Sequence, residues 1–436
     1  MNRRTVLESF KTMGFTLAAF MRPRLGRAGM ERYQLRKLQA ITRRAAEQVP
    51  FYREWFGRHG FDPAEIRDLS DVRRIPIMGK AEIRALRADW DDEEVKRRRL
   101  IEHKTSGSTG APVRILRSPA EERRLKMLRW RMQTMFGLRP GDRLARVKTN
   151  WEPLSRRYNR LQKLAGMVGF LDTRVFDCFQ DPAESYCQLL DFQPHVLSGY
   201  PGALARIALQ HEQQAGTLKS LRRIGTGGES LLPTQRQILE DTFGVPVYDA
   251  YGTSECNLAA WQCGETDHYH VNDDGILLEI CRDGVPVTPG ESGEVVITSL
   301  HSFTMPIIRY RLGDLAERGG SPCPCGSPFS TIRQLRGRVA DILKLADGRV
   351  IHPFEVLNEI VTEAGDWVAE YQRVQAAADR FCLECVPREP PGTETVAFLR
   401  DAILRVLGPG MALDIEFTDH IERSESGKLH FCRALR

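Results

Sequence analysis

The sequence has no run of about 18 apolar residues, so it predicts no membrane-spanning helix. Its ten cysteines are few for a chain of 436 residues and do not indicate a disulfide scaffold. A large excess of one charge is also missing, because the formal net charge is +6, which is too weak to indicate a nucleic-acid partner. The short apolar run 13–21 is followed at once by Arg22 and Arg24 and not by a cleavage site, which predicts a packed or interfacial helix and a cytoplasmic protein.

The most informative stretch is Thr105-Ser106-Gly107-Ser108-Thr109-Gly110, which combines two glycines with four hydroxyl groups. Glycine permits tight turns, and a concave ring of backbone N–H groups binds anions such as phosphate. The stretch lacks the Lys that follows the last glycine of a P-loop, because Gly110 is followed by Ala111 and Pro112. Taken alone it is also compatible with a flexible turn, and we expect it to join two strands, the second at residues 113–116.

From about residue 100 the pattern alternates between strands and helices, which is typical of α/β architecture. Residues 1–60 are expected to be helical, with a stop at Pro50-Phe51-Tyr52. After about residue 338 the pattern becomes β-α-β-α-β, enough for a small α+β domain, so we expect domains at 1–337 and 338–436. The expected helices span 119–136, 180–190, 201–214, 353–364 and 394–407. The expected strands span 143–147, 196–200, 224–228, 247–250, 276–281, 294–299, 350–351, 381–386 and 412–417.

Five polar clusters follow the hydroxyl-rich stretch along the chain. They are Gly225-Thr226-Gly227-Gly228-Glu229, Asp249-Ala250-Tyr251-Gly252-Thr253-Ser254-Glu255, Tyr310–Asp314, Arg338–Lys344 and Ser426–Lys428. Each cluster alone has an ordinary explanation, such as a turn, a solvated carboxylate, a surface ion pair or a surface lysine. By their chemistry, Tyr251 can stack on a base, Thr253 can bond a phosphate oxygen, Glu255 can hold Mg²⁺ and Asp314 can accept from ribose hydroxyls.

In this order the clusters resemble those of the adenylate-forming superfamily of acyl-CoA synthetases. The resemblance is greatest to the phenylacetate–CoA ligase branch, with its CapK-like members linked to capsular polysaccharide synthesis, and it extends from about residue 100 to 430. It implies that a carboxylate attacks the α-phosphate of ATP, giving an acyl-adenylate and pyrophosphate, and that a nucleophile then displaces AMP. It also implies a large N-terminal adenylation domain of mixed sheets and helices in several subdomains, followed by a small, mobile α+β domain.

The resemblance implies a role for each cluster. The stretch 105–110 would grip the β- and γ-phosphates, Glu255 and Thr253 would serve Mg²⁺ and the α-phosphate, and Lys428 would bridge the carboxylate and the α-phosphate. Residue Asp341 would be the hinge of the small domain. The remaining nucleotide-binding residues would be Gly227, Gly228, Glu229, Asp249, Ala250, Tyr251, Gly252, Asp314, Arg338 and Lys344. Two departures, Ala111 in place of Lys and Leu312 in place of Thr, are expected to lower the affinity for pyrophosphate.

Three cysteines and one histidine have the ligand chemistry of a tetrahedral Zn²⁺ site: Cys263, His270, Cys323 and Cys325. The Cys-x-Cys spacing is tighter than the usual zinc spacing, so unrelated cysteines in a glycine-rich loop are the alternative. The phenylacetate–CoA ligase branch has a similar arrangement, which favours a structural zinc and favours His270 over His268. Three other cysteines, Cys178, Cys187 and Cys256, are expected to be small core residues.

The resemblance also suggests the substrates. Aromatic residues expected to wall the acyl pocket are Trp151, Phe176, Tyr200 and Trp261, and the expected substrate is an aryl or arylacetic acid. Coenzyme A is the expected acceptor, with an acyl carrier protein or an amine as alternatives. The helix 119–136 carries Arg123, Arg124, Arg129 and Arg131, which form either a solvated face or a docking surface for an acidic carrier protein.

A non-catalytic nucleotide-binding homologue is the remaining functional alternative, and the presence of both Glu255 and Lys428 argues against it. The sequence leaves the oligomeric state open, a homodimer included.

Overall fold

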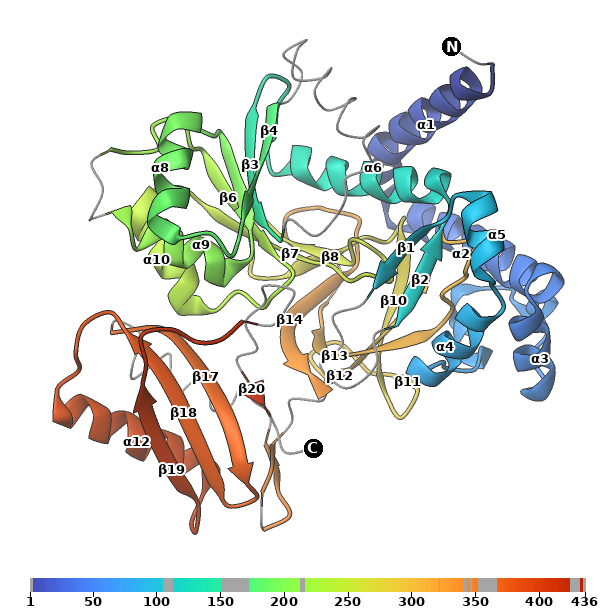
Figure 1. The fold of residues 1–436 in the computed structure, drawn as a ribbon. Helices are drawn as coiled ribbons and strands as arrows, with labels where there is room; N and C mark the ends of the chain where they lie inside the picture. Colours follow the sequence, from blue (N-terminus) through green and yellow to red (C-terminus); the bar gives the residue numbers. More distant parts are fainter. Residues whose placement is uncertain are drawn as a thin grey trace. The chain divides into compact units, whose positions relative to one another are not determined.

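The computed structural model describes residues 3–104, 113–149, 172–211, 216–320, 322–339, 343–345, 347–351, 367–423 and 432–433 (Figure 1). The chain divides into two compact units, and each is described here by itself. The first consists of Met1–Gly137 with Ala250–Leu335, and the second of Leu138–Asp249 with Arg336–Arg436. The division into domains at residue 337 stays a prediction.

The first unit begins with a helical region. Its helices are α1 (Arg3–Met21), α2 (Gly26–Gln48), α3 (Pro50–Arg58), α4 (Lys80–Ala88), α5 (Asp92–Arg98) and α6 (Pro119–Met135), with short 3-10 turns at Arg22–Leu25, Pro63–Glu65 and Leu69–Arg74. The expected stop at Pro50 is only a break, because proline is well tolerated as the first residue of a new helix and here begins α3. Helix α6 starts at a Ser118 cap whose side chain accepts from the Glu121 N–H.

The strands of the first unit are mostly antiparallel. Strands β1 (Ile101–Lys104) and β2 (Arg114–Arg117) form a separate hairpin. The others are β8 (Ala260–Gln262), β9 (Tyr269–Val271), β10 (Ile276–Arg282), β11 (Val285–Pro286), β12 (Ser292–Ser299), β13 (Tyr310–Arg318) and β14 (Thr331–Arg338), in the order β11-β10-β12-β13-β14-β9-β8. Their apolar faces pack with α2, α3 and α4 in one large core cluster, which includes Leu38, Tyr52 and Ile297.

The second unit contains a parallel sheet and a smaller mixed sheet. The parallel strands are β3 (Arg143–Lys148), β4 (Asp172–Asp177), β5 (Val196–Gly199), β6 (Arg223–Gly227) and β7 (Val247–Tyr251), in the order β7-β6-β5-β3-β4. Helices α8 (Pro182–Phe192), α9 (Pro201–Ala208) and α10 (Pro233–Phe243) alternate with these strands and share their core. Parallel neighbours require such crossover connections, which explains the alternation seen in the sequence.

The C-terminal part of the second unit has the four-stranded order β19-β18-β17-β20 with helix α12 (Thr393–Leu407). Its strands are β17 (Val368–Ala377), β18 (Arg380–Pro387), β19 (Ala412–Phe417) and β20 (Cys432–Arg433), and β15 (Leu343–Lys344) pairs separately with β16 (Val350–Ile351). The α/β fold class is confirmed. Strand β17 was not expected, and the helix expected at 353–364 lies outside the described residues.

A buried group of charges ties the N-terminal helices to the rest of the first unit. The Asp274 carboxylate accepts from Arg22 at 2.5 Å and from Arg131 at 2.7 Å, and Arg27 pairs with Asp273 at 2.7 Å. Burial opposes the ionisation of Asp274, but the nearby Arg131 and Arg22 guanidinium groups lower its pKa overall. Arg131 is therefore neither solvated nor a docking residue, and that part of the sequence-based expectation for the helix 119–136 is wrong.

None of the helices in the described part of the chain is long and apolar enough to cross a membrane.

Candidate active site and metal centre

The hydroxyl-rich stretch comes between strands β1 and β2, as expected from the sequence. Lys104 pairs with Arg114 in the antiparallel register, so residues 105–112 connect the two strands at one end of the hairpin. Residues 105–112 themselves, with the glycines, hydroxyls and Ala111 on which the prediction rests, lie outside the described residues. The structure therefore fixes where this connection begins and ends.

The segment after β7 holds a buried carboxylate. Glu255 is 6 % exposed, and burial raises its pKa, although hydrogen bonds from its own backbone and from the Thr253 hydroxyl partly oppose this. Gly252 is required at the start of the segment, because a Cβ there would collide with the carbonyl oxygen of Asn257. The charge of Arg117 favours ionisation of Glu255 but does not offset the cost of its burial, so the position suits a site for a bound cation.

Arg117 connects this segment to the hairpin and to α6. It is 1 % exposed, and its guanidinium donates to the Ser254 carbonyl and pairs with Glu122 at 3.3 Å. Burial disfavours the Glu122 carboxylate, but His103, Arg117 and Lys126 together lower its pKa to about 2. These charges are satisfied by one another inside the protein, which holds the backbone beside Glu255 in place.

Ser254 makes a second link, to the start of the connection. Its Oγ donates to the Lys104 carbonyl at 3.3 Å, one residue before Thr105. The end of β1 and the Glu255 segment are therefore adjacent in space, although Lys104 and Ser254 are 150 residues apart in sequence. Sequence reasoning assigned no role of its own to Arg117 or to Ser254, because both act through backbone carbonyls of distant residues.

Tyr251 and Asp314 come together from two strands. The Tyr251 hydroxyl donates to Asp314 Oδ2 at 2.6 Å, and burial together with this carboxylate raises the tyrosine pKa well above its usual value. The charge of Asp314 also contributes to the raised pKa of Glu255. Three residues that the sequence assigned to a single nucleotide site, Tyr251, Glu255 and Asp314, therefore lie in one neighbourhood of the first unit.

The second unit presents the glycine-rich cluster at the end of β6. Gly228 has a φ of +87°, which favours glycine and turns the chain away from the strand. The Asp249 carboxylate accepts from the Thr226 hydroxyl at 2.7 Å, and Glu229 accepts from the Gly202 N–H at 3.4 Å. The carboxyl ends of parallel strands are the usual position of ligand sites in α/β sheets.

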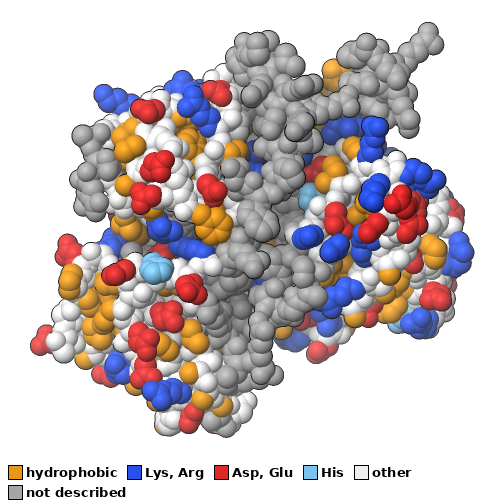
Figure 2. All heavy atoms as spheres, in the orientation of Figure 1, with side chains coloured by type: hydrophobic (Ala, Val, Ile, Leu, Met, Phe, Trp, Pro, Cys, Tyr) orange, Lys and Arg blue, Asp and Glu red, His pale blue; other side chains and the backbone are white. Residues whose placement is uncertain are grey.

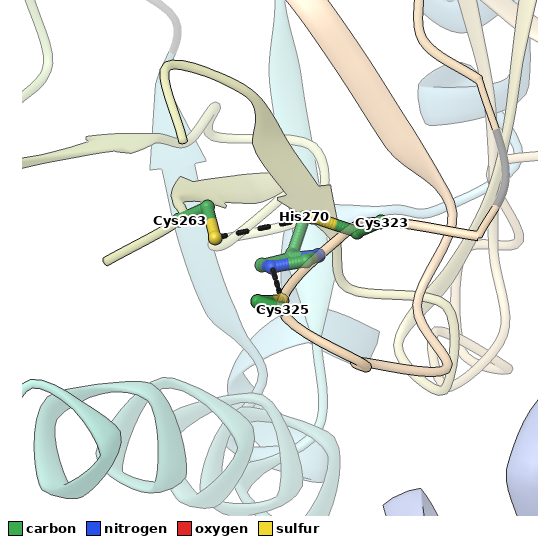
Figure 3. A group of neighbouring side chains, drawn as sticks. All are labelled: Cys263, His270, Cys323 and Cys325. Atoms are coloured by element: carbon green, nitrogen blue, oxygen red, sulfur yellow. Dashed lines mark hydrogen bonds between the residues drawn. The ribbon is translucent and has the colours of Figure 1, made fainter. Parts of the chain in front are cut away.

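The predicted metal ligands converge in the first unit, and Figure 3 shows their side chains pointing toward one another. Cys263 follows β8 and His270 lies on β9, while Cys323 and Cys325 lie in the connection between β13 and β14. The four ligand atoms all lie within 4.8 Å of one another. The Sγ atoms of Cys263 and Cys323 are 4.0 Å apart, and Cys325 Sγ is 3.3 Å from His270 Nε2.

These distances fit a tetrahedral zinc site. Two sulfurs bound to the same Zn²⁺ are about 3.8 Å apart, given Zn–S bonds of about 2.3 Å. Burial lowers the pKa of His270 to about 4, so its ring is neutral and one of its two ring nitrogens has a lone pair to offer. Burial and the neighbouring thiols raise the pKa of Cys325 to about 12, as expected for thiols that ionise together only beside a cation.

Comparison with known proteins was made on the whole chain. A family model described as AMP-binding enzyme matches residues 105–305, and one described as CapK C-terminal domain matches residues 343–434. The chain belongs to the adenylate-forming superfamily, in its phenylacetate–CoA ligase and CapK branch. The resemblance stated from the sequence is thereby confirmed.

Individual relatives of this chain agree with this placement. Phenylacetate-coenzyme A ligase of Thermus thermophilus is 26% identical over 450 residues, which cover 94% of this chain and 98% of that protein. The enzyme of the same name from Escherichia coli is 28% identical over 344 residues, 76% of each chain. Among solved structures, 2-hydroxyisobutyryl-CoA ligase in complex with 2-HIB-AMP has a TM-score of 0.77 at 22% identity, covering 93% of this chain and 89% of that chain.

Two other residues that the sequence assigned to the nucleotide site, Arg338 and Lys344, lie on strands β14 and β15. Arg338 ends β14 and is exposed, and Lys344 pairs with Val350 between β15 and β16. The remaining assigned residues that lie outside the described part of the chain are Trp151, Asp341 and Lys428.

The described aromatic candidates for the acyl pocket also differ in position. Tyr200 is half-buried at the start of α9, whereas Phe176 is buried beside Phe192. Trp261 is 1 % exposed and packs edge-to-face on Phe329, which favours a core position over one in a pocket wall. Among the cysteines expected in the core, Cys187 is exposed, so that expectation is wrong for it, whereas Cys178 and Cys256 are buried.

Proposed function

We propose that this protein is an acid–CoA ligase that activates a carboxylic acid with ATP and transfers the acyl group to coenzyme A. The observation that carries the proposal is that Glu255, Asp314 and the end of β1 at Lys104 come together through contacts of Ser254 and Tyr251. The names of the relatives support an aryl or arylacetic acid as substrate.

The chemistry requires charge neutralisation and positioning more than a protein nucleophile. In the first step a carboxylate oxygen bonds to the α-phosphorus of ATP and the bond to pyrophosphate breaks. In the second, the coenzyme A sulfur, having lost its proton, bonds to the acyl carbon and AMP leaves. Mg²⁺ bound with ATP would neutralise phosphate charge, and Glu255 is the buried carboxylate placed to hold it.

The remaining residues bind and orient the nucleotide in this proposal. Asp314, held by Tyr251, would accept from the ribose hydroxyls, and residues 105–110 would surround the outer phosphates with N–H and hydroxyl donors. Lys428 would bridge the two reacting groups, because a lysine is a compact positive charge on a long, mobile stem. In this proposal Arg117 and Ser254 position the Glu255 segment through the Ser254 and Lys104 carbonyls.

The first test is ATP–pyrophosphate exchange with a panel of carboxylates that includes phenylacetate and hydroxybenzoates. Exchange with at least one acid, followed by acyl-CoA formation detected by mass spectrometry, is the expected result. A parallel reaction with an acyl carrier protein or an amine in place of coenzyme A identifies the acceptor. Nucleotide binding without exchange for any acid would instead indicate a non-catalytic homologue.

Replacing Lys428 by alanine is expected to reduce exchange by several orders of magnitude while ATP binding stays close to normal, because the lysine acts in the transition state. Isothermal titration with a non-hydrolysable ATP analogue, beside the exchange assay, separates the two effects. Lys11→Ala is the matched control, because it removes one lysine from a surface helix and should leave exchange unchanged. Normal exchange in the Lys428 variant would refute its assigned role.

Asp314→Ala is expected to raise the KM for ATP by about 10- to 100-fold, because it removes a charged acceptor of hydrogen bonds. Tyr251→Phe keeps the ring and removes only the hydroxyl that holds Asp314, so its effect should be several-fold smaller. Steady-state exchange kinetics with varied ATP measure both values. A KM for ATP that is unchanged in the Asp314 variant would exclude this carboxylate from the nucleotide site.

We further propose that Cys263, His270, Cys323 and Cys325 hold a structural Zn²⁺. The donor set, its spacing and the neutral histidine ring support this. When bound, zinc would supply no reaction chemistry and would fix the β8–β9 turn against the connection between β13 and β14.

A further inference from the structure

The N-terminal helix α1 exposes an apolar face. Eleven large apolar side chains are exposed in the described part of the protein, and five of them lie within residues 13–25: Met13, Leu17, Phe20, Met21 and Leu25. Residues 13, 17, 20 and 21 recur at helical spacing, so their side chains share one side of α1. Burying such a patch is favourable by the hydrophobic effect, so its exposure indicates a binding surface.

The opposite side of α1 is already occupied, so the exposed face is not its core face. Phe15 packs edge-to-face on His301 at 5.2 Å, Ala19 is fully buried, and the Ala19 carbonyl accepts from Arg131. Helix α1 is therefore apolar on two sides, of which one packs on the first unit. In Figure 1 its N-terminal end projects away from the other helices.

Positive charge surrounds this face. Residues 1–44 contain eleven Lys and Arg, two of which (Arg22 and Arg27) pair with Asp274 and Asp273, and only two Glu, although the whole chain has a net charge of only +6. Exposed Lys11 and Arg24 flank the apolar residues, and exposed Arg32 and Arg36 continue the line of Leu25 along α2 at i+7 and i+11. Elsewhere, on the face shown in Figure 2, Lys and Arg are interspersed with Asp and Glu.

We infer that this face of α1 binds the surface of a membrane that contains anionic phospholipids. Helices with an apolar face and basic residues beside it lie in the interface of a bilayer, where acyl chains cover the apolar side chains and headgroup phosphates attract the Lys and Arg. A second copy of the chain fits less well. In a two-fold symmetric contact the basic residues beside the apolar face of one copy would face the same basic residues of the other copy, and these like charges would repel.

Flotation with lipid vesicles tests the inference on the full-length protein. Vesicles of phosphatidylcholine with phosphatidylglycerol should carry the protein upward at low salt, and vesicles of phosphatidylcholine alone should carry much less. Leu17→Glu should weaken the binding by about tenfold or more, because it places a charge in the apolar face. Val285→Glu is the matched control, since Val285 is 62 % exposed and Leu17 66 %, and it should bind as the unmodified protein does.

Pyrophosphate exchange and thermal unfolding of both variants should match those of the unmodified protein, because neither residue contacts the candidate active site. The inference is overturned if the unmodified protein does not float, if neutral vesicles carry it equally, or if Val285→Glu loses as much binding. Light scattering that shows a dimer broken by Leu17→Glu, without vesicle binding, would assign the face to a second copy. If the unmodified protein binds vesicles as expected but shows no pyrophosphate exchange, only the proposed function is contradicted.

Discussion

Replacing Glu255 by glutamine should lower acyl-adenylate formation by about 10²–10³-fold and at the same time stabilise the protein at neutral pH. The loss of activity follows from removing the charge that would hold Mg²⁺ beside the phosphates. The gain in stability follows from burial, because it disfavours the ionised carboxylate by more than the Arg117 charge favours it, and a neutral amide of the same shape avoids that cost.

The pH dependence of this difference has a definite sign. The pKa of Glu255 is raised in the folded protein, so the stability that it contributes is present below its unfolded pKa, about 4.3, and is lost as pH rises through its folded pKa. The free energy of unfolding of the glutamine variant should therefore exceed that of the unmodified protein increasingly as pH rises. Urea unfolding at several pH values in Mg²⁺-free buffer measures this difference. The exchange activity of the unmodified protein should decrease as pH falls, because Glu255 then becomes protonated.

Glu279 provides a matched control for this experiment. It is a second buried glutamate of the same unit, and burial raises its pKa as well, but Arg309 pairs with it at 3.1 Å. Glu279→Gln should therefore lower stability, because it leaves a buried arginine without its charge partner, and should leave the activity of the folded fraction unchanged. If Glu255→Gln keeps full turnover, or if both variants behave alike, the assignment of Glu255 is wrong.

Cys323→Ser should remove bound zinc and lower the free energy of unfolding by about 4 kcal/mol, on the order of 10 °C in Tm. The unmodified protein should contain one zinc per chain by elemental analysis, and its cobalt-substituted form should show thiolate-to-metal absorption. Cys187→Ser is the matched control, because Cys187 is exposed and belongs to no metal cluster among the residues that the structure describes, and it should change neither zinc content nor Tm.

Two results would refute the zinc site. One is that elemental analysis finds no metal in the purified, unmodified protein. The other is a disulfide between Cys263 and Cys323 found by mass spectrometry. The thiols lie 4.0 Å apart, so the redox state has to be controlled during purification.

The sequence predicted this site through residue types in a recognisable order. Cys263, His270, Cys323 and Cys325 were assigned as ligands, and the structure brings all four together. The two strands around residues 105–112 were also predicted, because Pro112 and the following β-branched residues have a local signature. Such features depend on chemistry or propensity that a short stretch of sequence carries by itself.

Features that depend on distant partners could not be predicted in this way. Arg131 looked like one of several surface arginines of an amphipathic helix, but its partner Asp274 is 143 residues away. Arg117 acts on the Ser254 carbonyl, and every residue has a carbonyl, so no residue type marks the contact. Pro50 was expected to be a stop because proline breaks the interior of a helix, but proline is also favoured as the first residue of a new helix, as in α3.

The shared carboxylate of Asp274 has a practical consequence for anyone who shortens this protein for expression or crystallisation. Arg22 and Arg27 supply positive charge to Asp274 and Asp273 from the very beginning of the chain. A fragment that starts at the adenylation motif, near residue 100, would leave these two acids in the interior with part of their neutralising charge removed. Trimming from the N-terminus should therefore stop before Arg22, and solubility tags belong ahead of that arginine, not in its place.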